Sequence, residues 1–292
     1  MRRNLLFTAI VLAMCTSLRA EGTDDYGVWG EVNVEKTVAQ KWTVGVNAHF
    51  RTKETSAQLD RWGVGVDASY KLHKYLKLGA GVELLNDYTP VKIKDWDGAG
   101  WEFDTEDGTA ERKTGYRRTE SYLTPKWRLK FEVSSGVKIA KWVKISARVR
   151  YRYARVGSVS ALRTKFRKTD SYNAVSLQDW QWALSEAGEW TSELTDPKEK
   201  DAYSNHQLRS RVKIEMDRKR VKWHPFVSGE VFNDLSDGGN MYKIRLAAGC
   251  GYDINKHHNI TLAYVLTMHE RETEADFGER MHATSVNYNI KF

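Results

Sequence analysis

The stretch Val143–Tyr153, "VKISARVRYRY", alternates strictly between two kinds of side chain. Every second residue, starting with Val143, is apolar or aromatic, while the residues between them are a lysine, a serine and three arginines. A period of two is typical of a β-strand, because successive side chains point to opposite faces. A soluble sheet buries its apolar face in a core, but a membrane β-barrel turns that face to lipid and its polar face to the lumen. Full charges in mid-strand favour the barrel.

The same alternation recurs along the chain in stretches of about 9–14 residues, the length that a tilted strand needs to cross a bilayer. Strands of soluble proteins average about 5–6 residues. The further stretches are 42–50, 61–71, 208–216, 242–254 and 259–269. The last residues, "SVNYNIKF" (285–292), alternate as well and finish on a phenylalanine. A frayed chain end normally has small or polar residues, because it has little to bury against. A terminal phenylalanine therefore predicts that this strand lies in apolar surroundings.

Short basic turns alternate with longer connections, and aromatic residues gather near the strand ends. This arrangement is typical of an up-and-down barrel with aromatic girdles and long extracellular loops, here near 89–116 and 156–203. Lipid cannot satisfy backbone N–H and C=O groups, so a spanning sheet must close on itself. The sequence therefore predicts an all-β fold, a transmembrane up-and-down antiparallel β-barrel of ten to twelve strands.

Eleven strands can be placed, but single-chain bacterial barrels have even strand numbers. Either residues 26–36 lie partly inside the lumen, or a further strand lies in a long loop. Within the second loop, Trp180, Ala183, Leu184 and Ala187 recur at helical spacing and predict a short amphipathic helix. The predicted strands lie near 26–36, 42–52, 59–71, 75–88, 118–138, 142–155, 205–217, 223–233, 241–254, 259–270 and 281–292.

Residues 1–20 are typical of a secretory signal peptide, with two arginines, the apolar run Leu5–Leu18 and cleavage after Ala20. Cys15 suggests a lipid anchor only weakly, since Met14 stands where a small residue is expected. We therefore expect residues 21–292 to form a single barrel domain in the cell outer membrane. Without its signal the chain keeps 43 of 46 Lys and Arg residues against 38 Asp and Glu. This dispersed charge predicts no nucleic-acid partner, and one remaining cysteine excludes an internal disulfide framework.

Six arginines on the predicted inner face are candidates for a lumen constriction that prefers anions. Barrels of about 8 strands are filled by side chains and barrels of about 16–18 strands conduct freely, so this chain lies between. A narrow transport pore and a structural lattice that closes the lumen both fit the pattern. The candidate constriction residues are Arg148, Arg150, Arg152, Arg209, Arg211 and Arg245.

An alternative is an outer-membrane lipid hydrolase. In "MHATS" (281–285), His282 and Thr284 share the lipid-facing side, and the pair resembles the His-x-Ser pair of barrel lipases. A threonine at the nucleophile position and an inward-pointing Ser285 weaken this interpretation. Zinc spacings, phosphate-binding loops and dinucleotide fingerprints are absent from the sequence. We therefore expect no enzyme, no catalytic residues, no cofactor and no metal.

Four stretches carry a resemblance to an uncharacterised family of outer-membrane proteins from Gram-negative bacteria, a domain of unknown function. They are 26–51, 59–84, 206–216 and 243–264, and the resemblance covers most of 26–292 outside the long loops. It implies location and fold but no activity. It also implies outer-membrane lipid, lipopolysaccharide and the barrel assembly machinery as partners, the last reading a terminal strand that ends in Phe292. We expect a monomer, because trimeric porins have larger barrels.

Overall fold

The computed structural model describes residues 24–54, 56–104, 106–176, 181–218, 221–270 and 277–292. The predicted signal peptide, residues 1–20, lies outside the described residues. Every regular element in the described part is a β-strand. Among those residues, no helix is long and apolar enough to cross a membrane.

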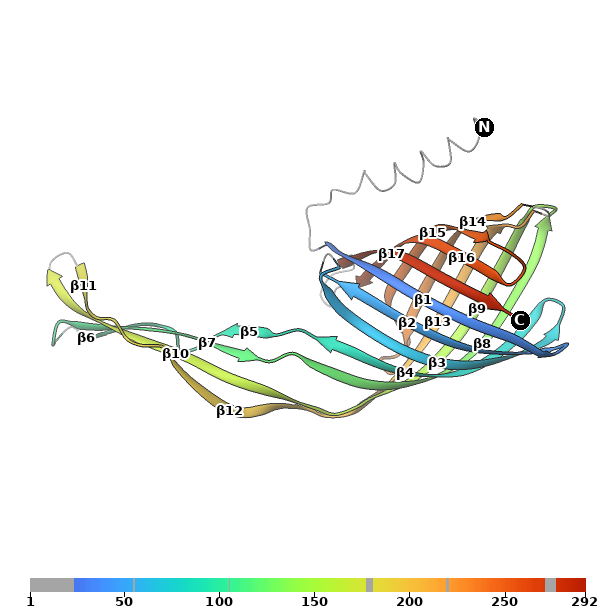
Figure 1. Cartoon of the computed structure of the whole chain (residues 1–292). Coiled ribbons are helices and arrows are strands. Elements are labelled where there is room, and N and C mark those ends of the chain that lie inside the picture. Colours follow the sequence, from blue (N-terminus) through green and yellow to red (C-terminus); the bar gives the residue numbers. More distant parts are fainter. Residues whose placement is uncertain (1–23, 55, 105, 177–180, 219–220, 271–276) are drawn as a thin grey trace, which may run out of the picture. The chain divides into compact units, whose positions relative to one another are not determined.

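In the described part of the chain, eleven strands form a closed barrel (Figure 1). This confirms the predicted all-β barrel of ten to twelve strands, and each strand overlaps a range predicted from the sequence. Short connections at 40–41, 74–75, 141–142 and 254–257 define one end of the barrel, which we call the turn end. The barrel strands are β1 (Asp24–Ala39), β2 (Trp42–Lys53), β3 (Gln58–His73), β4 (Leu76–Thr89), β8 (Tyr122–Ala140), β9 (Val143–Val156), β13 (Tyr203–Met216), β14 (Trp223–Asp234), β15 (Asn240–Asp253), β16 (His258–Glu270) and β17 (Phe277–Lys291).

The barrel closes through a parallel pair, β1 with β17, whose register runs from Asp24 opposite Arg280 to Glu35 opposite Lys291. Neither alternative to an odd strand number holds in the described residues. Residues 26–36 belong to a full wall strand, and the strands in the long connections belong to a separate sheet and not to the barrel wall. An odd number of up-and-down strands leaves the first and last pointing the same way. A parallel ladder still pairs the backbone groups, so the sheet closes without an edge.

The two segments predicted as long loops form a second sheet, in which β10 is flanked by β7, β11 and β12. Tyr116 of β7 lies opposite Phe166 of β10 in its register. Its strands in the described residues are β5 (Lys92–Asp95), β6 (Gly100–Asp104), β7 (Thr109–Thr119), β10 (Val159–Ser176), β11 (Gln181–Glu186) and β12 (Thr191–Lys200).

The predicted amphipathic helix is wrong over its described part, because Gln181–Glu186 is strand β11. Trp182 lies opposite Ala174 of β10 and its ring contacts Phe103, with 5.7 Å between ring centroids. Cross-strand pairing and aromatic contact outweigh a weak helical period in so short a segment. Trp180, which the same prediction used, lies outside the described residues.

The chain divides into two compact units. The single domain over residues 21–292 stays a prediction. Among the described residues, the barrel unit comprises those within 24–83, 128–153 and 205–292, and the sheet unit comprises those within 84–127 and 154–204. The sheet unit forms because its segments also alternate, with aromatic residues that contact one another across the strands, such as Tyr116 and Phe166. Each unit is described by itself below.

The barrel unit is polar inside and apolar outside. On the outer wall, Val46 and Leu262 are each 57% exposed, whereas Arg209 and Glu230, which face the lumen, are each 5% exposed. The alternation of the strands produces this division, because each wall strand has one face toward the lumen. Exposed apolar residues continue around successive strands and include Val34, Val46, Val66, Val82, Phe131, Val149, Val212, Val227, Leu246 and Leu262.

Candidate functional site

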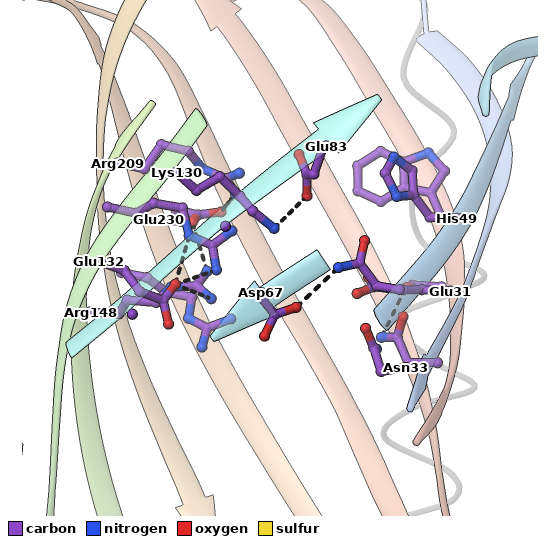
Figure 2. Close-up of a pocket in the computed structure, with 18 of the residues that line it drawn as sticks. Glu31, Asn33, His49, Asp67, Glu83, Lys130, Glu132, Arg148, Arg209 and Glu230 are labelled. Atoms are coloured by element: carbon purple, nitrogen blue, oxygen red, sulfur yellow. Dashed lines mark hydrogen bonds and ion pairs between the residues drawn. The ribbon is translucent and has the colours of Figure 1, made fainter. Parts of the chain in front are cut away.

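The barrel lumen contains a cavity of about 570 Å³, lined by side chains from every wall strand. Figure 2 shows part of this lining. Among the described residues, its lining includes eleven Arg and Lys residues and six Asp and Glu residues. Five positive charges are therefore in excess around one enclosed space. This charged cavity is the candidate functional site.

Glycines on β3 and β4 make room for the long charged side chains. A Cβ atom on Gly79 would lie 2.8 Å from Cγ of Glu132, and one on Gly65 would lie 2.8 Å from Cγ of Glu83. Carbon atoms do not approach so closely, so larger residues would displace both carboxylates. Glycines of these strands therefore leave space for inner side chains.

Glu83 anchors one side of the lumen. Its carboxylate accepts hydrogen bonds from Nη1 of Arg128 at 2.9 Å and from Nζ of Lys130 at 2.7 Å. All three side chains are at least nine-tenths buried. One carboxylate therefore serves two cations across β4 and β8, and the Lys130 bond is drawn in Figure 2.

Glu132 and Glu230 hold the other charges together. Glu132 accepts hydrogen bonds from Nε and Nη2 of Arg150 at 2.8 and 2.5 Å. Glu230 pairs with Arg209, and its oxygens lie 3.3 Å from Nη2 of Arg148 and 3.8 Å from Nη1 of Arg245. We call Glu83, Glu132, Glu230 and the cations paired with them the charge lattice.

Aromatic rings stack with cations beside the charge lattice. The guanidinium groups of Arg51 and Arg245 lie 4.5 and 4.6 Å from the centre of the Trp29 ring. Arg209 lies 4.3 Å from the centre of the Phe232 ring, which is 2% exposed. Sequence reasoning missed these two rings, although Trp29 and Phe232 share the inward face with Glu31 and Glu230.

All six predicted constriction residues line this one cavity. Four of them are paired with lattice carboxylates, and two, Arg152 and Arg211, have no carboxylate oxygen within 4.0 Å among the described residues. The structure thus brings the six together, while their role as a constriction stays a prediction.

Two further cavities lie between the charged cavity and the turn end. A second cavity of about 590 Å³ shares Glu35 and Lys213 with the first and reaches the turn at Asn255. A third cavity of about 520 Å³ shares Lys77 with the first and reaches the turn at Lys74. Both further cavities therefore neighbour the charged cavity and extend to the turn end.

His282, the base of the alternative lipid hydrolase, is 2% exposed. Its Nδ1 lies 2.5 Å from the hydroxyl oxygen of Tyr264, its Nε2 lies 3.4 Å from Oδ2 of Asp24, and its ring stacks on Tyr26. Both ring nitrogens therefore face groups other than Thr284. This cluster joins β1, β16 and β17 at the parallel seam, and sequence reasoning missed its tyrosines.

Within the described residues, no three His, Cys, Asp or Glu side chains group as metal ligands would. The expected absence of a metal stays a prediction.

Comparison with solved structures finds the translocator domain of the autotransporter NalP from Neisseria meningitidis. The NalP domain and this chain share 12% sequence identity. The match covers 91% of this chain and 90% of the NalP domain, with a TM-score of 0.28. No curated protein matches the chain. A family model described as "Protein of unknown function (DUF2490)" matches residues 26–278. That match spans most of both units and confirms the resemblance to a domain of unknown function; the chain belongs to the DUF2490 family.

Proposed function

We propose that this chain is an integral outer-membrane β-barrel that acts as a narrow, anion-preferring passage and not as an enzyme. The observation that carries the proposal is the reversed polarity of the barrel, with apolar side chains on the outer wall and charges inside. Each exposed Val or Leu forgoes roughly 1.5–3 kcal/mol of apolar transfer free energy in water. A wall of such residues is stable in hydrocarbon, and a closed sheet is the form in which strands can span it.

The lumen supplies the preference for anions. Five excess positive charges around the cavity of about 570 Å³ attract anions and repel cations. The charge lattice and the stacked rings narrow the space, which favours small solutes. A structural barrel with a closed lumen is the competing role, because the same ion pairs could seal it.

Membrane residence is tested by charge placed at two depths of one wall strand. Val66 and Leu72 are both exposed on the outer face of β3, but Leu72 lies near the turn end. In lipid, Val66→Arg should destabilise the barrel by about 2–4 kcal/mol, and Leu72→Arg by about 0–1 kcal/mol. Urea unfolding in lipid vesicles measures both. A soluble protein would tolerate the two changes equally, and recovery of the wild type in the periplasm would also refute membrane residence.

Transport is tested by conductance of the purified chain in planar bilayers under a salt gradient. We expect small single-channel currents whose reversal potential indicates anion selectivity. Replacing Arg148, Arg150 and Arg152 by Gln should shift that potential toward cations. Unchanged selectivity in this triple variant would remove the constriction, and absence of current from the folded wild type would favour the structural role.

The lipid hydrolase gains no support, because the ring nitrogens of His282 contact Tyr264 and Asp24. We expect His282→Ala to leave membrane lipid composition unchanged. We further propose outer-membrane lipid and lipopolysaccharide as surroundings, recognition of the strand ending in Phe292 by the assembly machinery, and a monomeric state. Crosslinking in native membranes tests all three.

A further inference from the structure

Three neighbouring wall strands all contribute arginines to the lumen cavity, among them Arg128 from β8, Arg152 from β9 and Arg209 from β13. Arg209, Arg128 and Arg150 repel the positive charge of Arg152, and Glu83 attracts it. Like charges on adjacent strands repel, so this arrangement needs a compensating negative charge. We call Arg128, Arg152 and Arg209 the arginine cluster.

Protein carboxylates compensate the arginine cluster incompletely. Glu83 pairs with Arg128 and Glu230 pairs with Arg209, but both carboxylates also serve other cations. Arg152 has no carboxylate oxygen within 4.0 Å in the part of the chain that the structure describes. The cluster therefore retains positive charge that an anion can balance.

The cluster also has hydrogen-bond donors to spare. The Nε atoms of Arg152 and Arg209 are buried and make no hydrogen bond to any described residue. Arg209 is only 5% exposed, and buried N–H groups in folded proteins are nearly always paired. Both arginines line the cavity, and Arg152 makes no hydrogen bond or ion pair with any described residue, so a ligand there meets a guanidinium group that the protein leaves unused.

We infer that the arginine cluster is a binding site for a phosphate group, with Arg152 and Arg209 as its donors. Guanidinium groups present planar pairs of N–H donors that match the oxygens of a tetrahedral oxyanion, whereas a halide uses only the charge. The cavity volume of about 570 Å³ lies in the range that holds a small organic ligand. Inorganic phosphate and a phosphate monoester of a small solute both fit this chemistry.

This inference deepens the proposed anion passage and rests on it for the route by which phosphate enters the lumen. Binding itself needs neither conductance nor a membrane, so the two can fail separately. The experiment is isothermal titration of the full mature chain in detergent micelles with inorganic phosphate, at constant ionic strength. Parallel titrations use glycerol phosphate, to separate the two sources, and chloride, to measure the effect of charge alone.

We expect saturable binding of one phosphate group per barrel, and weaker binding of chloride. Arg152→Gln should reduce the affinity for phosphate about tenfold or more, the effect of losing a charge-assisted contact. Arg152→Lys retains the charge but not the planar pair of N–H donors, so it should give an intermediate loss of phosphate affinity. Heat-modifiable gel migration checks that each variant is folded, and the Lys variant keeps the test decisive if the Gln variant does not fold.

Lys213→Gln is the matched control, because Lys213 lines the same cavity but pairs with Glu215 at 2.5 Å. This variant also removes one positive charge, but at a position outside the arginine cluster. It should change phosphate affinity less than about twofold. Equal losses in Lys213→Gln and Arg152→Gln would overturn the inference in favour of diffuse attraction. Absence of phosphate binding by the folded wild type would also overturn it.

Discussion

The ion pair between Arg209 and Glu230 in the barrel leaves each side chain 6% exposed, whereas the pair between Lys113 and Glu102 in the second sheet leaves them 27% and 65% exposed. Both pairs come from strands with alternating residues. The barrel hides its charged face because the sheet closes around it, and an open sheet cannot enclose either of its faces. Closure of the sheet therefore decides how deeply a charge pair is buried.

Aromatic residues differ between the two units in the same way. In the second sheet they contact one another across strands, as Tyr116 and Phe166 do at 4.7 Å and Trp101 and Tyr172 at 4.8 Å. In the lumen, Trp29 and Phe232 instead contact cations. The open sheet is held by ring contacts on its surface, and the barrel by a buried network of charges.

The largest effect is expected from Glu230→Gln, which removes the buried ion pair of the comparison between the two units. The change leaves Arg148, Arg209 and Arg245 without their shared carboxylate, and breaking a buried ion pair costs about 3–5 kcal/mol. Urea unfolding of the purified chain in detergent, followed by gel migration, measures the loss. Glu102→Gln in the second sheet removes an exposed pair and should leave unfolding unchanged. Equal stability of the two variants would show that closure does not strengthen the pair.

An intermediate effect is expected at glycines of the barrel wall, one on the inner face and one on the outer face, and sharpens the barrel side of the comparison. Gly79→Ala places a methyl group 2.8 Å from Cγ of Glu132 and should cost about 1 kcal/mol through overpacking. Gly229→Ala meets its nearest atom, Cδ2 of Leu246, at 3.7 Å and should be neutral or stabilise by up to about 1 kcal/mol. The same unfolding assay measures both. A larger loss of stability in Gly229→Ala than in Gly79→Ala would mean that the lattice carboxylates do not need the space that glycine leaves.

The smallest effect is expected at Asp170 of the second sheet. A hydrogen bond from Lys168 lowers the pKa of Asp170 below its ordinary value of 3.8, and a second hydrogen bond, from the backbone N–H of Gly188, lowers it further. A lowered pKa stabilises the fold above the ordinary value, and that contribution is lost as the pH falls through the lowered value. We expect hydrogen-exchange protection of Gly188 to persist down to pH 3.8 and to decline below it. Asp170→Asn should abolish that pH dependence, and a loss of protection near neutral pH would contradict it.

Much of the barrel follows from local sequence. The alternation in Val143–Tyr153 identifies a strand and separates its charged face from its apolar face, since a period of two depends only on neighbouring residues. The six predicted arginines line one cavity for that reason. The helix predicted around Ala183 and Leu184 is wrong because a short apolar period fits a helix and a strand alike, and pairing with β10 decides between them.

The sequence by itself determined that the chain forms long two-faced strands, where most of them lie and which charges share a face, because these properties repeat every two residues. Only the tertiary structure decided that β1 and β17 close the barrel in parallel, that the long connections pair into a second sheet, and that Arg152 is left without a carboxylate. These features depend on register between residues up to about 250 positions apart. Such register is set by backbone hydrogen bonding around a complete ring, which no local period encodes.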